Sequence, residues 1–187
     1  EAIADPALEQ LRNVLWVVDL NRQSLDRIIP GIRINAWKGM FDANGWHVIE
    51  AKYGKKLEAA FQEPNGRLLK QTIDEMSNQT YQRLLRVSPE ILRDWLPKTS
   101  KFPVDVKNLI DQWNNEELKD LFGNLGGHDF ETLRESFEKI DLGKTPSVIF
   151  AYTLKGWNLP IVGDPQNHSA SLNPTQMQQL RIELGVP

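Results

Sequence analysis

The chain has 187 residues, 40% of them hydrophobic and 25% charged, with a formal net charge of -3 and no cysteine. These values are typical of a globular protein with a hydrophobic core rather than a disordered chain, and the net charge gives no reason to expect binding to nucleic acid or to an anionic membrane. The lack of cysteine excludes disulfides and thiolate chemistry, and no apolar run approaches the roughly 20 residues that span a bilayer.

The first residues carry neither an initiator methionine nor the basic and apolar regions of a signal peptide. Because Glu1 has the character of mid-helix sequence, we expect the chain to be part of something longer. A cytoplasmic protein is compatible with these features, and this is the location that we expect.

Three segments are predicted to be buried strands. Residues 14–18 form a continuous apolar, β-prone run, residues 46–51 alternate in part, and residues 147–153 follow Pro146, which suits the start of a strand. Runs that are apolar on both faces favour a parallel sheet covered by helices.

Helices are predicted between and after these strands. Asn44-Gly45 ends a helical pattern, Asp129 is a candidate N-cap, and Ser88-Pro89 and Asn173-Pro174 each combine a cap with proline at the first helical position. The order of strands and helices predicts an α/β fold, in which three layers consist of a mostly parallel sheet flanked by helices. We expect a single domain over residues 1–187, with a helix-rich insertion at about 55–141 and an active-site-type loop at about 156–173.

Ligands of open parallel sheets bind beyond the carboxyl ends of the strands. The first predicted strand leads into Asp19, Asn21 and Gln23, which offer the carboxylate, amide and carbonyl oxygens that Mg²⁺ prefers. An ordinary polar turn explains the same residues, because such residues are common where strands end.

The third predicted strand leads into Lys155 and a long loop that contains His168. His168 is a candidate general acid or base, and Lys155 a candidate phosphate contact. The alternatives are a surface histidine and a solvated lysine. Gly126-Gly127 allows either close backbone approach or a simple entry to the helix that Asp129 caps. The sequence contains no glycine-rich phosphate loop, nucleophile elbow or histidine spacing suited to a metal.

Several segments resemble the decarboxylating subunit of homodimeric pyruvate dehydrogenases, a branch of the transketolase-like enzymes that use thiamine diphosphate. The segment 15–26 is similar to the second half of the thiamine-diphosphate motif. Further segments agree in order: 45–49, 52–54, 124–129, 151–157 and 163–168.

The resemblance implies a role for each matching residue. Asn21 matches a side-chain ligand of Mg²⁺, and Gln23 matches the position whose backbone carbonyl completes that site. Asp19 and Lys155 match positions near the cofactor's diphosphate. At the position of Asp19, asparagine is commoner in the enterobacterial enzymes. His168 matches the histidine of a loop that orders over bound intermediates, although this loop is shorter here.

The chain also departs from the family. The first half of the motif, a Gly-Asp-Gly or Gly-Asp-Ala signature whose aspartate binds magnesium, would precede Glu1 and is absent. The pyrimidine-binding domain, whose glutamate activates the cofactor, is absent too. We therefore expect the isolated chain to bind thiamine diphosphate and Mg²⁺ poorly and to be inactive.

The resemblance predicts a parent enzyme that oxidatively decarboxylates a 2-oxo acid, pyruvate from glycolysis, and passes the acyl unit to a lipoyl group. Its expected partners are the pyrimidine-binding domain, the second subunit of a homodimer and a lipoyl-bearing acyltransferase, with neither nucleic acid nor membrane among them. Two alternatives remain: a transketolase-like enzyme that transfers two-carbon units, and a non-catalytic split or degenerate subunit used in assembly.

Overall fold

The computed structural model describes residues 2–5, 7, 11–24, 27–28, 34–140 and 143–186. The chain forms two compact units. The first comprises residues 1–20, 32–59 and 124–153, and the second comprises residues 21–31, 60–123 and 154–187. Leu25 and Asp26, the last two residues of the segment 15–26 that resembles the thiamine-diphosphate motif, lie outside the described residues.

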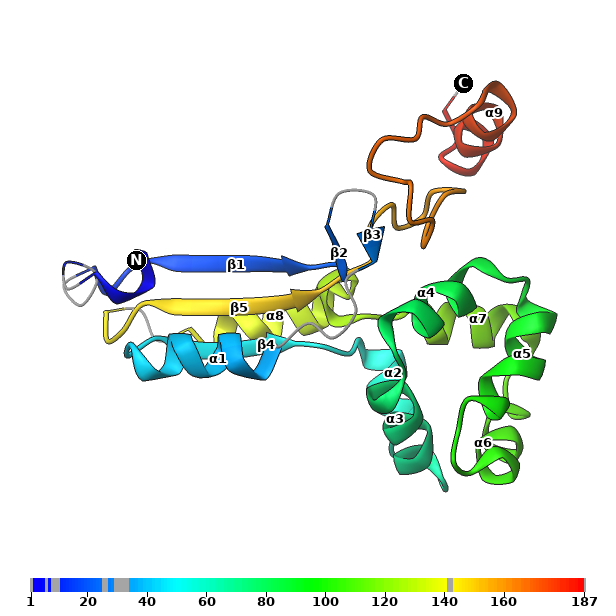
Figure 1. Ribbon diagram of the computed structural model, residues 1–187, viewed down its shortest axis with the longest axis horizontal. Helices are drawn as coiled ribbons and strands as arrows, with labels where there is room; N and C mark the ends of the chain where they lie inside the picture. The colour runs from blue at the N-terminus through cyan, green and yellow to red at the C-terminus, as the bar shows by residue number, and fades with distance from the viewer. Residues whose placement is uncertain are drawn as a thin grey trace. The chain divides into compact units, whose positions relative to one another are not determined.

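The first unit is built on a parallel sheet of three strands in the order β1-β5-β4. Its strands are β1 (Leu15–Leu20), β4 (His47–Ala51) and β5 (Ser147–Tyr152), which lie side by side in Figure 1. All six residues of β5 are buried, because this strand is central and both of its faces are covered. The three predicted strands and their parallel arrangement are confirmed, but the predicted burial of the first is wrong: β1 is an edge strand and most of its residues are exposed.

Helices cover both faces of this sheet. Side chains alternate along β5, so Val148 and Phe150 pack on the side of α1 (Ile34–Ala43), with Phe41 and Trp46. On the opposite face, Ile149 and Ala151 of β5 form a second cluster with Ile49 and Ala51 of β4. This cluster packs against Leu133 of α8 (Phe130–Glu138) and against Ile140, which follows that helix. The predicted three-layer α/β fold is therefore confirmed in this unit.

Two glycines bring a short turn against the ends of two strands. Both lie in the short 3-10 helix η3 (Gly126–His128). The unit also contains the short helices η1 (Ala2–Ala4) and α2 (Lys55–Ala60). A Cβ atom on Gly126 would lie 2.5 Å from the carbonyl carbon of Ala51, and one on Gly127 would lie 2.5 Å from the oxygen of Tyr152. The structure thus shows close backbone approach at this pair, and the pair also leads into the helix that Asp129 caps, so both roles considered for it are present.

The second unit is largely helical. Its helices are α3 (Gly66–Glu75), α4 (Asn78–Arg86), α5 (Pro89–Lys98), α6 (Pro103–Ile110), α7 (Asn115–Gly123) and α9 (Pro174–Glu183). A short antiparallel pair, β2 (Gln23–Ser24) and β3 (Arg27–Ile28), belongs to the same unit. Leucines dominate its buried side chains, among them Leu69, Leu84, Leu92, Leu96, Leu109 and Leu118.

The predicted helix starts are confirmed by their caps. The side chain of Ser88 accepts a hydrogen bond from the N–H of Ile91, and that of Asp129 accepts one from Thr132. Asn173 forms a full capping box with Gln176 at the start of α9. In the described ranges, no helix is both long and apolar enough to cross a membrane.

Two groups of apolar residues in this unit are only partly buried. Trp16, which lies in the run of residues 14–18 predicted to be a buried strand, is 42% exposed, and Trp37 of α1 is 45% exposed. Trp16 lies on an edge strand, where it contacts Phe41 edge-on with ring centroids 5.6 Å apart and leaves its outer side uncovered. The apolar stripe of α8 is also only partly buried, since Phe130 is 87% exposed while Leu133 packs on the sheet.

Candidate functional site at the strand exits

Asp19 lies at the carboxyl end of β1. Its backbone is in register with Ala151 of β5, and its carboxylate accepts a hydrogen bond from the hydroxyl of Thr153, which follows β5 directly. In a parallel sheet this end is where ligands bind. Asp19 is therefore at the end of the sheet where the sequence predicted a site.

The chain continues from β1 into a tight turn at Asn21, Arg22 and Gln23. The side-chain oxygen of Asn21 accepts a hydrogen bond from the backbone N–H of Gln23 at 3.0 Å, and Arg22 has a φ of 62°. This is the turn in which an asparagine side chain replaces a backbone acceptor. It fixes the Asn21 side-chain oxygen beside the backbone N–H of Gln23, so the two residues predicted as magnesium ligands belong to one turn.

Side chains of α4 and of the segment after β5 hold this turn within the second unit. Gln82 donates its side-chain N–H to the backbone oxygen of Asn21 at 3.5 Å, and Gln23 donates to the backbone oxygen of Asp164 at the same distance. The carboxylate of Asp164 pairs with Arg86 at 3.2 Å. One helix, α4, thus contacts both the turn and the loop.

Arg22 stacks on an aromatic ring of the same helix. Its guanidinium carbon lies 4.3 Å from the centre of the Tyr81 ring, close enough for a cation–π interaction. Tyr81 is buried and donates its hydroxyl to the oxygen of Phe122 at 2.9 Å. Burial raises the pKa of Tyr81 to about 12, so this phenol is neutral at physiological pH and serves as packing and hydrogen-bond donor.

Lys155 and His168, predicted separately, are in direct contact. Nζ of Lys155 lies 2.6 Å from Nδ1 of His168, and the lysine ammonium donates this bond when the imidazole is neutral. Asn167 fixes the backbone between them, since its side chain donates to the oxygen of Lys155 at 2.8 Å. His168 itself is exposed.

The fit of a cation to these residues depends on the available oxygen ligands. Asn21 and Gln23 supply amide and carbonyl oxygens, which suit Mg²⁺ but carry no charge. Within the described residues there is no group of three or more His, Cys, Asp or Glu that could hold a metal ion. Taken alone, these two oxygens would supply only an uncharged part of a magnesium shell.

Sequence reasoning missed Gln82, Asp164 and Arg86. Glutamine and arginine are common on helix surfaces, so their local pattern gives no sign that Gln82 contacts a turn about 60 residues earlier or that Arg86 pairs with Asp164. One signal was present for Gln82, because it follows Tyr81 and shortly precedes Leu84 and Leu85, which are all buried residues of α4.

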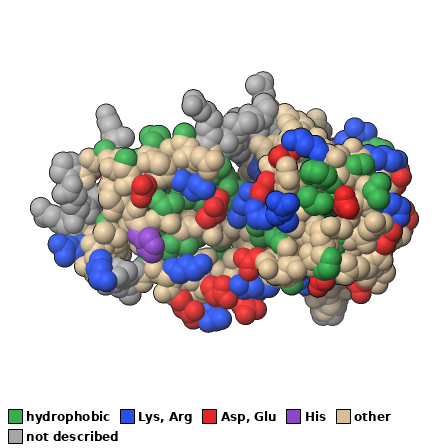
Figure 2. All heavy atoms as spheres, turned by 90° about the horizontal axis from the view of Figure 1, so that it is seen from below, with side chains coloured by type: hydrophobic (Ala, Val, Ile, Leu, Met, Phe, Trp, Pro, Cys, Tyr) green, Lys and Arg blue, Asp and Glu red, His purple; other side chains and the backbone are tan. Residues whose placement is uncertain are grey.

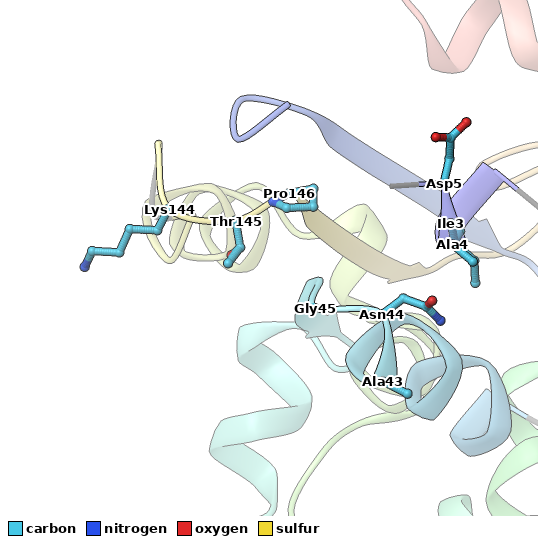
Figure 3. A pocket seen from close by; sticks show the side chains of 9 residues that line it. All are labelled: Ile3, Ala4, Asp5, Ala43, Asn44, Gly45, Lys144, Thr145 and Pro146. Carbon is cyan, nitrogen blue, oxygen red and sulfur yellow. The ribbon is translucent and has the colours of Figure 1, made fainter. Parts of the chain in front are cut away.

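A cavity of about 350 Å³ lies at the opposite end of the sheet, where Ala43–Gly45 lead toward β4 and Lys144–Pro146 toward β5. Figure 3 shows that the charged side chains of Asp5 and Lys144 point away from each other. Polar groups do not converge there as they do in ligand sites. On the face drawn in Figure 2, acidic and basic side chains are interspersed, so the described residues form no patch of a single sign there.

Comparisons with known proteins point to one enzyme name. No family model matches the chain. It is 27% identical to the pyruvate dehydrogenase E1 component of Escherichia coli K12 over 96% of its own length. The corresponding proteins of Buchnera aphidicola subsp. Schizaphis graminum and Cupriavidus necator are 28% and 25% identical over 89% and 100% of this chain. The chain spans about a fifth of the length of these relatives, 18–21%.

Proposed function

We propose that the chain is part of the decarboxylating subunit of a thiamine-diphosphate- and magnesium-dependent pyruvate dehydrogenase, and that its strand exits belong to the diphosphate-binding region. The similarity to pyruvate dehydrogenase E1 components along nearly the whole chain supports this proposal. The observation that carries it is the turn at Asn21–Gln23, which directly follows the carboxyl end of the parallel strand β1. In this turn the side-chain oxygen of Asn21 accepts a hydrogen bond from the backbone N–H of Gln23.

In this proposal the residues act by binding and orienting. Thiamine diphosphate, when bound, supplies the electron sink for decarboxylation of the 2-oxo acid. The Asn21 side chain and the Gln23 carbonyl are the cation ligands, whereas Asp19 and Lys155 are assigned to the diphosphate from the resemblance. His168 moves a proton or stabilises charge through Nε2, because the ammonium of Lys155 at Nδ1 favours the tautomer with the proton on Nε2.

The chain alone is proposed to be inactive. Its cation ligands are neutral, and a magnesium site of this kind needs carboxylate or phosphate charge. The partners proposed to complete it are a pyrimidine-binding domain, a second subunit and a lipoyl-bearing acyltransferase as acyl acceptor. The comparisons favour the dehydrogenase over a transketolase-like activity, since the relatives reported above share one name.

Cofactor binding tests the proposal. We expect the melting temperature of the purified chain to stay within about 1 °C when millimolar thiamine diphosphate and Mg²⁺ are added, because a ligand stabilises only a state that it binds. A shift of several degrees would show that the chain binds the cofactor alone.

A longer polypeptide that carries the upstream motif and the pyrimidine-binding domain should decarboxylate pyruvate. In it, Asn21→Ala should weaken magnesium-dependent cofactor binding about tenfold or more, as expected when a metal ligand is removed. Asn108→Ala, on the exposed face of α6, is the matched control and should leave binding unchanged. Equal affinities in both variants would remove Asn21 from the cation site.

A further inference from the structure

Gln82 is a buried amide whose hydrogen-bonding capacity is only partly used. Its side chain is 1% exposed, and its Oε1 has no hydrogen-bond partner in the described part of the chain. Oε1 of Gln23 is buried and unpartnered in the same way. Burying an unsatisfied acceptor costs free energy, so an apolar side chain would suit the stability of α4 better. A residue that is costly to the fold is a candidate for a functional role.

The contacts of Gln82 show what that role is. Its Nε2 donates to the backbone oxygen of Asn21, the residue whose side chain closes the turn. The buried, unpartnered Oε1 of the same amide offsets what this 3.5 Å contact contributes, so the net effect of Gln82 on overall stability is small. Its effect is local, because it fixes the peptide group that joins Asn21 to the turn.

The segment after β5 closes over the same amide. Gly163 has a φ of 73°, and a Cβ atom there would lie 3.0 Å from the backbone oxygen of Gln82 and 3.3 Å from its Oε1. A glycine thus permits close approach to Gln82 in a backbone conformation that other residues rarely adopt. The next residue, Asp164, accepts the side-chain N–H of Gln23 and pairs with Arg86. The turn, α4 and the loop therefore meet around Gln82.

We propose that Gln82 is a positioning residue, which holds the Asn21–Gln23 turn in the conformation that binds the cation and links that turn to the loop at Gly163–Asp164. The claim that the turn binds a cation rests on the proposed function. The claim that Gln82 holds the turn and links it to the loop does not depend on that function. The unpartnered oxygens of Gln82 and Gln23 are suited to accept hydrogen bonds from water, and Mg²⁺ usually retains water ligands.

Hydrogen exchange in the purified chain tests the positioning directly. In Gln82→Met, the protection of the Gln23 backbone N–H should fall about tenfold, because the turn opens more often when its anchor is lost. The melting temperature should be unchanged or higher, since a partly satisfied buried amide has been removed. Thr72→Val is the matched control: Thr72 is also buried in this unit, but its hydroxyl bonds Leu68 of its own helix, α3, and Ser100, which follows α5.

Unchanged protection of Gln23 in folded Gln82→Met, or an equal loss in Thr72→Val, would overturn the inference. Should Gln82→Met not fold, Gly163→Ala provides the same test from the loop side. It should also reduce the protection of Gln23, because its Cβ displaces Gln82, and unchanged protection there would equally overturn the inference.

A kinetic test in the longer polypeptide described above separates positioning from a purely structural role. Gln82→Met should raise the apparent KM for Mg²⁺ about tenfold while kcat changes less than twofold, as expected for lost binding without lost chemistry. A fall in kcat with an unchanged KM would refute positioning. If the exchange result holds but the longer polypeptide binds no cofactor, the proposed function fails while the anchoring of the turn by Gln82 stands.

Discussion

The two faces of the parallel sheet are packed in different ways. On the side of α1, rings meet edge to face: Phe41 contacts Trp46 and Phe150 with centroids 5.2 and 5.7 Å apart. On the side of α8, the sheet presents isoleucine and alanine. Large rings fill space by themselves, whereas small side chains need a close approach of the backbone. The first face therefore depends on aromatic side-chain volume, whereas the second is filled by smaller aliphatic side chains, and Gly126 and Gly127 permit a close backbone approach at the ends of β4 and β5.

The largest expected effect is on the aromatic face. Phe150→Ala should lower the free energy of unfolding by about 3–5 kcal/mol, because it leaves a cavity at a fully buried position. Chemical denaturation measures the change. Phe130→Ala is the control: this ring is 87% exposed, so its removal should cost less than about 0.5 kcal/mol. Similar losses in both variants would contradict the described packing.

The second prediction concerns the glycines beside the other face. Gly127→Ala should cost about 1–3 kcal/mol, because its Cβ would lie 2.5 Å from the backbone oxygen of Tyr152 and backbone must move. Gly39→Ala in α1 meets nothing within 4 Å and should instead stabilise the chain by up to about 1 kcal/mol through helix propensity. Thermal unfolding of both variants tests this, and a neutral Gly127→Ala would show that close approach is unimportant.

A smaller effect is expected at the start of α8. Burial alone would raise the pKa of Asp129, but hydrogen bonds from Thr132, Lys55 and Asn124 lower it overall. Asp129→Ala should cost about 1–2 kcal/mol near pH 7, the usual value of a helix cap.

The same variant predicts a dependence on pH. Because the pKa is lowered on folding, the contribution of the carboxylate is complete above its unfolded value of about 3.9 and is lost as the pH falls through the folded value. The stability difference between wild type and Asp129→Ala should therefore be constant from pH 7 to 5 and shrink toward pH 3. Denaturation curves at each pH measure it, and a difference that grows on acidification would contradict the assigned role.

Much of the sheet and several helix ends could be predicted from sequence, because their signals are local. The apolar runs at β1 and β5 and the caps at Ser88 and Asn173 depend only on neighbouring residues. The exposure of Trp16 could not be predicted in this way. An apolar run predicts a buried strand whether that strand lies at the centre or at the edge of a sheet. The edge position of β1, which leaves Trp16 partly exposed, depends on the order of the strands, and this order is not encoded locally.

The candidate site divides in the same manner. Asn21 and Gln23 are two residues apart in sequence, so their hydrogen bond in one turn follows from local chemistry. The contact of Gln82 with Asn21 depends on the tertiary path of α4, and nothing in its own segment indicates that partner. The contact of Lys155 with His168 depends on how the intervening residues turn, which the sequence left open.

The start of α2 has a consequence for biosynthesis. This helix has six residues, and its first N–H groups bond to side chains much later in the chain: Lys55 to Asp129, and Lys56 to Asn124. So short a helix is marginal without tertiary contacts. During translation it therefore has no stable form until the ribosome has released some 70 further residues, and a nascent chain halted before Asn124 would expose this segment to proteases.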